Sequence, residues 1–194
     1  MKTTNRLNGK DFVNIGIFTA IDFIIVTAAA MLGFIPIFMP LLCAIAPLVS
    51  GIPYMLYLTK VRKFGMIWIM NILLGLLMFL TGMSYHALII SVFTGLAADL
   101  VCKSGNYKSA AKGIISHGVF SIYIAGNFFL LTFMKDKYFA TRQTLGSDYI
   151  EKLSSYTPVW VFPILILACF IFGIIGALIG KAMLKKHFAK AGIA

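Results

Sequence analysis

Long apolar stretches, separated by short segments that hold most of the charged residues, make up nearly the whole chain. A membrane-spanning helix needs about 20 mostly apolar residues, and fewer where the membrane is thin. Six stretches meet or approach this length, at about 12–33, 37–59, 65–81, 84–102, 112–134 and 158–181. The pattern predicts an all-α membrane protein, with a six-helix transmembrane bundle that forms one integral membrane domain over 1–194. We therefore predict a multi-pass protein of the cell (plasma) membrane.

Only one connection between these stretches is long, the segment 135–157. Its larger apolar side chains fall on one face when the segment is drawn as a helix, and they are Tyr149, Ile150, Leu153 and Tyr156. The spacing predicts a short amphipathic helix that lies over the outer face of the bundle. A plain surface loop is the alternative, and whether the segment closes as a lid is left open by the sequence.

Composition supports the membrane class and changes how the charge is understood. Hydrophobic residues are 60% of the chain and the mean hydropathy is +0.94, which is more apolar surface than a soluble domain of 194 residues can bury. The net charge of +11 could indicate nucleic acid. Membrane proteins, however, collect Lys and Arg in their cytoplasmic loops, and no soluble basic module is present, so we predict no nucleic-acid partner.

The distribution of basic residues predicts the orientation. With the N-terminus inside, every inner segment is positive, and both termini face the cytoplasm. The four outer basic residues are Lys135, Lys137, Arg142 and Lys152. The other thirteen of the 17 are inner: Lys2, Arg6, Lys10, Lys60, Arg62, Lys63, Lys103, Lys108, Lys112, Lys181, Lys185, Lys186 and Lys190.

The first span combines small residues with an acid. Gly16 and Ala20 lie four apart and share one helix face, which lets another helix approach closely. At 100° per residue, Asp22 points about 140° away from them. A carboxyl group inside a membrane costs about 2.5–3.5 kcal/mol on insertion scales, so it should face the bundle interior or a wet cavity. We therefore predict that Gly16 and Ala20 face a partner, with packing inside the chain's own bundle as the alternative. Similar strips recur in the fourth and sixth spans, at Ser91, Gly95 and Asp99, and at Cys169, Gly173, Gly176, Ala177 and Gly180.

Three sequence stretches carry a resemblance to a known family: "GIFTAIDF", "GIPYMLYLTKVRKFG" and "FTGLAADLV". Together with six spans, about 190 residues and both termini inside, they resemble the substrate-binding S component of an energy-coupling factor (ECF) transporter, and more closely its Trep_Strep group. The resemblance implies capture of a vitamin or metal-related substrate outside, and association with a transmembrane T component and two cytosolic ATPases. It also implies that the first helix contacts the T component. The usual Ala-x-x-x-Ala strip is matched here by Gly16 and Ala20, whereas Asp22 fits no motif of the family.

Two polar residues lie toward the cytoplasmic side of the bundle. Asp99 ends the fourth span and His117 lies early in the fifth. A pair between them would lower the cost of burying the acid. We predict a structural pair, with a role in coupling or release as the alternative. For Asp22 a hydrogen bond from the protonated acid to neighbouring backbone is the alternative to a functional role.

Residues at the outer ends of the spans predict a substrate pocket. Such a pocket is mostly apolar with a few polar groups that fix orientation, and its candidate lining is Phe38, Met39, Met83, Tyr85, His86, Asn127, Tyr156 and Trp160. Because the spans hold no Arg to clamp a carboxylate, an apolar or flat-ring ligand is favoured over a small anion. Haem or a related tetrapyrrole, with His86 as axial ligand, is the most specific prediction, and a vitamin-like heterocycle is the broader one.

Motifs for other chemistry are absent from the sequence. It has no nucleotide-binding glycine motif, no H-E-x-x-H and no G-x-S-x-G, and its three cysteines show no pairing or metal-ligand spacing. We therefore predict no enzyme activity, no metal site and no intrinsic cofactor, with haem only as a transported ligand. The alternatives are an autonomous small secondary carrier or channel, in which Asp22 and Asp99 relay protons, and an intramembrane enzyme that uses His86, His117 and the acids.

Overall fold

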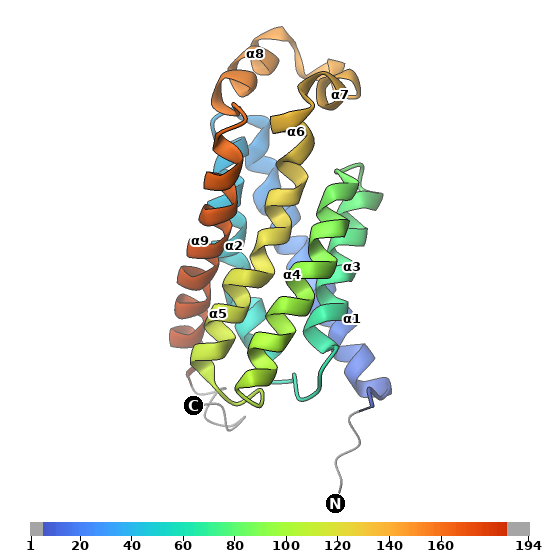
Figure 1. Ribbon diagram of the computed structural model, residues 1–194, viewed down its shortest axis with the longest axis vertical. Coiled ribbons are helices and arrows are strands. Elements are labelled where there is room, and N and C mark those ends of the chain that lie inside the picture. Colours follow the sequence, from blue (N-terminus) through green and yellow to red (C-terminus); the bar gives the residue numbers. More distant parts are fainter. Residues whose placement is uncertain (1–5, 186–194) are drawn as a thin grey trace, which may run out of the picture.

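Helices that run side by side along one axis form the body of the protein (Figure 1). This computed structural model describes residues 6–185, and no strand occurs in that part of the chain. The long elements are α1 (Gly9–Ala30), continued by the 3₁₀ helix η1 (Met31–Phe34), then α2 (Phe38–Leu58), α3 (Met66–Leu80), α4 (Tyr85–Ser104), α5 (Ala110–Ser121) and α9 (Val161–Met183).

The predicted helical bundle is confirmed, with one short member. Within residues 6–185, five helical segments are long and apolar enough to cross a membrane, and α3 is an apolar helix of only 15 residues. At 1.5 Å per residue α3 is about 22 Å long, which is less than the usual hydrocarbon thickness. It is short because a glycine at positive φ lies just beyond each end, Gly65 at 99° and Gly82 at 85°.

The fifth span is composite, which the hydropathy pattern did not predict. After α5 the chain tightens into the 3₁₀ helix η2 (Ile122–Phe128) and then returns to α-helix in α6 (Phe129–Phe133). A 3₁₀ run of seven residues is longer than usual, and such a stretch inside a helix often marks a functional position.

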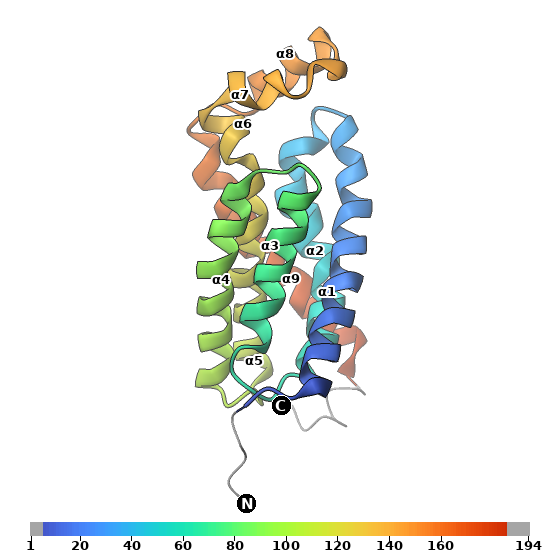
Figure 2. The same cartoon turned by 90° about the vertical axis from the view of Figure 1, so that its right-hand side faces the viewer.

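The segment after α6 forms a cap across one end of the bundle (Figures 1 and 2). It contains α7 (Lys135–Ala140), the short η3 (Gln143–Leu145) and α8 (Ser147–Tyr156). The predicted amphipathic helix is confirmed as α8. Leu153 is fully buried, and Tyr149 and Ile150 are half-buried, whereas Tyr156 is 40% exposed.

Two hydrogen bonds attach the cap to the turns beneath it. Arg142 donates from Nη2 to the Gly82 carbonyl at 3.0 Å. The Tyr149 hydroxyl donates to the Gly33 carbonyl in η1. Burial raises the pKa of Tyr149, which keeps this hydroxyl protonated and able to donate.

Glycines bring α2 and α9 into backbone contact. A Cβ added at Gly51 would lie 2.1 Å from the Gly176 carbonyl carbon, and one at Gly180 would lie 2.6 Å from the Gly51 oxygen. Gly173 also lies close to Gly118 of α5, with 2.9 Å between its added Cβ and the Gly118 Cα. The small-residue strip of the sixth span therefore serves packing within the chain.

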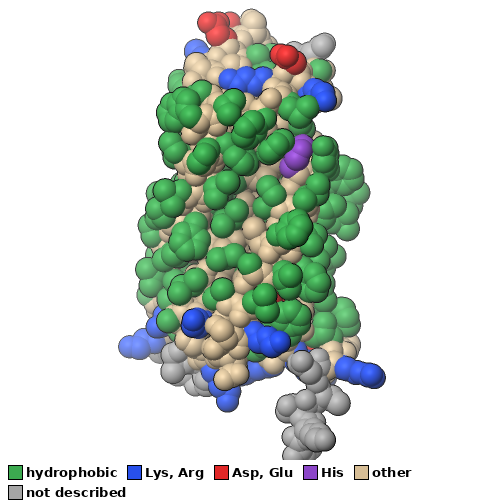
Figure 3. All heavy atoms as spheres, in the orientation of Figure 1, with side chains coloured by type: hydrophobic (Ala, Val, Ile, Leu, Met, Phe, Trp, Pro, Cys, Tyr) green, Lys and Arg blue, Asp and Glu red, His purple; other side chains and the backbone are tan. Residues whose placement is uncertain are grey.

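The surface has the distribution of a membrane protein (Figure 3). Apolar side chains cover the middle of the visible face, and Lys and Arg side chains gather at the end opposite the cap. The start of α1 and the end of α9 lie at this basic end (Figure 1), which the positive-inside rule assigns to the cytoplasm. Lys2, Lys186 and Lys190, which belong to the predicted inner set, lie outside the described residues.

Candidate functional site

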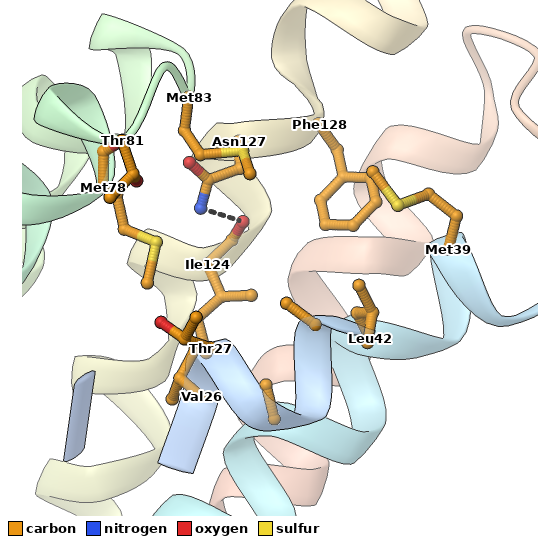
Figure 4. Close-up of a pocket in the computed structure, with 12 residues that line it drawn as sticks. Val26, Thr27, Met39, Leu42, Met78, Thr81, Met83, Ile124, Asn127 and Phe128 are labelled. Carbon is orange, nitrogen blue, oxygen red and sulfur yellow. Dashed lines mark hydrogen bonds between the residues drawn. The ribbon is translucent and has the colours of Figure 1, made fainter. Parts of the chain in front are cut away.

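A cavity of about 160 Å³ lies at the cap end of the bundle (Figure 4). It forms between the last turns of α1, the first turns of α2, the end of α3 and η2. Its lining is almost entirely apolar, with Thr27, Thr81 and Asn127 as the polar side chains. The lining residues are Val26, Thr27, Ala30, Met39, Leu42, Ala46, Met78, Thr81, Met83, Ile124, Asn127 and Phe128.

The 3₁₀ stretch η2 supplies one wall of this cavity. Side chains three apart eclipse each other in a 3₁₀ helix, so Ile124 and Asn127 face the same way. The Asn127 amide nitrogen donates to the Ile124 carbonyl at 3.2 Å (Figure 4). The Asn127 carbonyl oxygen is buried and has no hydrogen-bond partner. An unpartnered acceptor thus lies in the wall of a cavity that could admit a ligand.

Three of the eight predicted pocket residues line the cavity, namely Met39, Met83 and Asn127. The other five lie outside the lining. Tyr85 and Trp160 are exposed, at 52% and 68%, on the outer surface. Phe38 begins α2 one residue before Met39, and Tyr156 ends α8, and neither side chain reaches the lining.

His86 is held in an aromatic stack outside the cavity. Its ring lies between those of Tyr85 and Phe129, with centroid distances of 4.0 and 4.2 Å. Its Nδ1 is 2.6 Å from the Ser84 hydroxyl. The lining of the cavity does not include His86. His86 could therefore be an axial ligand of a group in this cavity only if its side chain moved. No group of three His, Cys, Asp or Glu that could hold a metal occurs within residues 6–185.

Most of the lining was not predicted from the sequence. Val26 and Ala30 lie one turn apart on α1, and Leu42 and Ala46 one turn apart on α2. From this spacing, the two members of each pair could have been predicted to lie on the same helix face. Because these helices are apolar all round, however, hydropathy does not tell which of their faces points inward.

Asp22 lies at mid-span on the interior side of α1, as predicted. It is 1% exposed, and neither carboxyl oxygen has a hydrogen-bond partner among the described residues. The predicted alternative, a hydrogen bond to neighbouring backbone, is therefore wrong. Thr19, one turn earlier, and Tyr123 of η2 also carry buried hydroxyls that have no hydrogen-bond partner among the described residues.

Asn71 of α3 is linked to Tyr123 through Phe120. Its amide nitrogen donates to the Phe120 carbonyl at 3.4 Å, while its carbonyl oxygen is buried without a partner. The Phe120 ring in turn packs edge-on against Tyr123, with 5.8 Å between centroids. We call Thr19, Asp22, Asn71 and Tyr123 the polar layer.

The predicted pair between Asp99 and His117 does not form. Asp99 accepts hydrogen bonds from the backbone nitrogens of Gly65 at 2.8 Å and Trp68 at 3.1 Å. Its other oxygen accepts from the Tyr107 hydroxyl at 2.8 Å. The carboxylate thus satisfies free N–H groups at the start of α3, where a negative charge is favoured.

His117 instead joins three helices. Its Nδ1 donates to the Gly173 carbonyl of α9 at 2.7 Å, since a carbonyl can only accept. In a neutral ring Nε2 then accepts, and the Ser50 hydroxyl of α2 lies 3.2 Å from it. His117 therefore connects α5 to α9 and α2, and the predicted pair with Asp99 is wrong.

Gly16 and Ala20 lie on the outer surface of α1. Both are exposed, and a Cβ added at Gly16 would meet nothing within 4 Å. Large apolar side chains surround them, including Val13 at 60% exposure and Ile24 at 65%. Packing inside the chain's own described part is excluded, in contrast to the glycines of α9. This face is open to lipid or to another helix.

Comparison with known proteins identifies the family. The sequence profile of the family described as "Hypothetical bacterial integral membrane protein (Trep_Strep)" matches residues 9–190. No curated protein and no solved structure matches the chain. The match covers every membrane helix described above, in agreement with a multi-pass architecture. The chain therefore belongs to the Trep_Strep family of bacterial integral membrane proteins.

Proposed function

We propose that this protein is the substrate-capture subunit of an ATP-driven importer of the ECF type. The observation that carries the proposal is the apolar cavity at the predicted outer end, which lies between the helix ends where the cap is attached. A concave apolar site with a few polar groups is the usual form of a small-molecule site. The sequence resemblance to S components gives this site its proposed role in uptake.

The outward face of α1 supports a membrane partner. Gly16 and Ala20 leave a shallow strip between large apolar side chains, and a strip of this kind lets a second helix approach closely. We propose that a transmembrane T component binds here and that two cytosolic ATPases supply the energy. The chain itself would then bind substrate and perform no chemistry.

The cavity volume favours a small ligand. A cavity of about 150 Å³ accommodates benzene, so 160 Å³ fits a ligand part of about one aromatic ring. A vitamin-like heterocycle is thus better supported than a tetrapyrrole, which would need the cap to open. For haem we expect no Soret shift on titration of the purified protein, and a saturable shift would restore the tetrapyrrole prediction.

Capture can be tested with a pair of alanines two residues apart. Ala30 lines the cavity, whereas Ala28 is exposed and does not. Protein purified in mild detergent is analysed by mass spectrometry for bound small molecules. We expect a ligand in the wild type and in Ala28→Phe but not in Ala30→Phe, because the new ring fills the cavity. Equal occupancy in both variants would show that the cavity is not the capture site.

One observation favours a second function, an autonomous secondary carrier. An unpartnered acid at mid-span is typical of proton or ion pathways. Reconstitution of the purified chain alone into liposomes separates the two functions. The proposed capture subunit binds its ligand but does not move it, whereas a carrier transports without ATPases.

A further inference from the structure

Two members of the polar layer are close along the chain to residues that line the cavity. Val26 follows Asp22 by one helical turn and lines the cavity, and Ile124 follows Tyr123 directly and lines it too. The oxygens of Asp22 have almost no access to solvent in this arrangement.

The layer and the adjoining wall lack hydrogen-bond donors. Four of their buried oxygens have no hydrogen-bond partner among the described residues: both oxygens of Asp22 and the amide oxygens of Asn71 and Asn127. The amide oxygens can only accept hydrogen bonds, and the same holds for the Asp22 oxygens when the acid is ionised. The amide orientations are set by the bonds that their nitrogens donate. Only the hydroxyls of Thr19 and Tyr123 could donate, with one hydrogen each. Whatever completes this layer must therefore bring donors or positive charge.

No side chain of the described residues supplies that charge. The ion pair between Lys63 and Asp11 lies at the basic end of α1 and does not involve Asp22. The cavity lining contains no basic residue, and His117 is occupied by Gly173 and Ser50. An ionised acid that is buried without a partner is costly, so such groups in native proteins are protonated, paired with another charge or bound to a cation.

We propose that the polar layer binds a cationic group of ammonium type or size, and that Asp22 is its counter-ion. The group has two possible sources, a protonated nitrogen of the captured molecule or a free monovalent cation. The first source rests on the proposed function and deepens it. The captured molecule would then have one apolar ring in the cavity and a cationic nitrogen at Asp22.

The experiment uses the purified full-length chain and thermal unfolding. Benzylamine is the organic probe, because its ring fits the cavity volume, and benzyl alcohol is the matched neutral control for partition into detergent. NaCl, KCl and NH₄Cl are the ion probes, compared at equal ionic strength with the bulky N-methylglucamine chloride. Each series is repeated with Asp22→Asn and with Asp148→Asn, an exposed acid on α8.

We expect benzylamine to raise the melting temperature saturably, with an apparent affinity at least tenfold above that of benzyl alcohol. The effect should weaken at least tenfold in Asp22→Asn and stay unchanged in Asp148→Asn. Stabilisation by an inorganic cation alone, lost in Asp22→Asn, would instead assign the layer to a free ion. The proposal is overturned if no cationic probe exceeds its control, or if Asp22→Asn responds like the wild type.

The test is independent of ligand capture. If Ala30→Phe loses a co-purified ligand while Asp22→Asn retains it, capture stands and a nitrogen of the captured molecule is ruled out as the cationic group. If neither change affects any ligand but the cations act through Asp22, the cation site stands and the proposed function fails.

Discussion

At the scale of single residues, three acids of this protein lie in different environments. Asp99 caps α3, Asp11 accepts a 2.7 Å hydrogen bond from Lys63, and Asp22 has no hydrogen-bond partner within residues 6–185. A buried acid without a partner lowers the stability of a membrane protein, so such acids are usually found where function requires them. The environment of each acid therefore separates structural acids from the candidate ligand contact.

The role of Asp99 predicts a loss of stability on substitution. Asp99→Ala removes the acceptor of two backbone N–H groups and of the Tyr107 hydroxyl. Hydrogen bonds to charged groups contribute about 1.5–3 kcal/mol each, so unfolding in detergent should occur at a clearly lower temperature. Asp148→Ala is the matched control and should unfold like the wild type. Equal melting temperatures would show that Asp99 is not the cap of α3.

Sequence reasoning predicted that Asp22 faces the interior and that Gly16 and Ala20 lie on another face of α1, because rare polar and small residues stand out in apolar helices. It was wrong about the partner of His117, which is not Asp99. It did not find the partners of Asp99, since hydropathy carries no information on how far the α4–α5 turn folds back. It also placed Tyr85 and Trp160 in the pocket, because aromatic residues near a membrane interface look alike whether they face a cavity or lipid.

At the scale of elements, strips of small residues with the same spacing lie in different surroundings. Gly176 of α9 lies against the backbone of α2, with 2.5 Å between its added Cβ and the Leu48 oxygen. An added Cβ at Gly16 of α1 would have no described atom of a neighbouring element within 4 Å. In the sequence, Gly16 and Gly176 look alike, because each has another small residue three or four positions away. Only the structure shows that one is packed against a helix and the other is not.

This contrast predicts different defects for the same kind of change. Gly176→Ala should destabilise the α2–α9 contact by about 1–3 kcal/mol, because backbone must move to admit the methyl group. Gly16→Ala should leave stability unchanged. Thermal unfolding of the two variants in one detergent provides the comparison, and a similar melting temperature for both would contradict the close packing of α2 and α9.

The cap predicts a local effect on mobility. Arg142→Ala removes the hydrogen bond to Gly82 and the contact of the guanidinium with the Tyr138 ring at 4.2 Å. We expect hydrogen exchange to accelerate several-fold within 135–157, consistent with the loss of about 1 kcal/mol, and to stay unchanged in α2 and α9. Lys152→Ala, an exposed residue of the same cap, is the control. Unchanged exchange in the Arg142 variant would mean that this hydrogen bond does not hold the cap.

At the scale of the whole molecule, hydropathy and charge predicted the helical bundle and its orientation, since both follow from the bilayer as solvent. The predicted span limits agree with the helices to within a few residues. The 3₁₀ stretch η2 and the cavity beside it were not predicted, because they depend on tertiary packing within uniformly apolar helices.

Orientation can be measured with single cysteines. Ser104 at the end of α4 and Ser147 at the start of α8 are exposed and lie at opposite ends of the bundle. The three native cysteines are free and buried, so they should react slowly. An impermeant thiol reagent added to intact cells should label Ser147→Cys and leave Ser104→Cys unlabelled until the membrane is opened. Labelling of both from the outside would contradict the assigned topology.

The central claim is that the chain captures a ligand for a partner which docks on the outward face of α1. Affinity purification of the tagged protein from its native membrane, in the wild type and in Gly16→Leu and Ala20→Leu, tests this claim most directly. The wild type should retain a transmembrane partner and two ATPases, and both leucine variants should lose them while keeping the melting temperature and bound ligand. Purification of the wild type without any ATPase, or retention of the ATPases by both variants, would contradict the account.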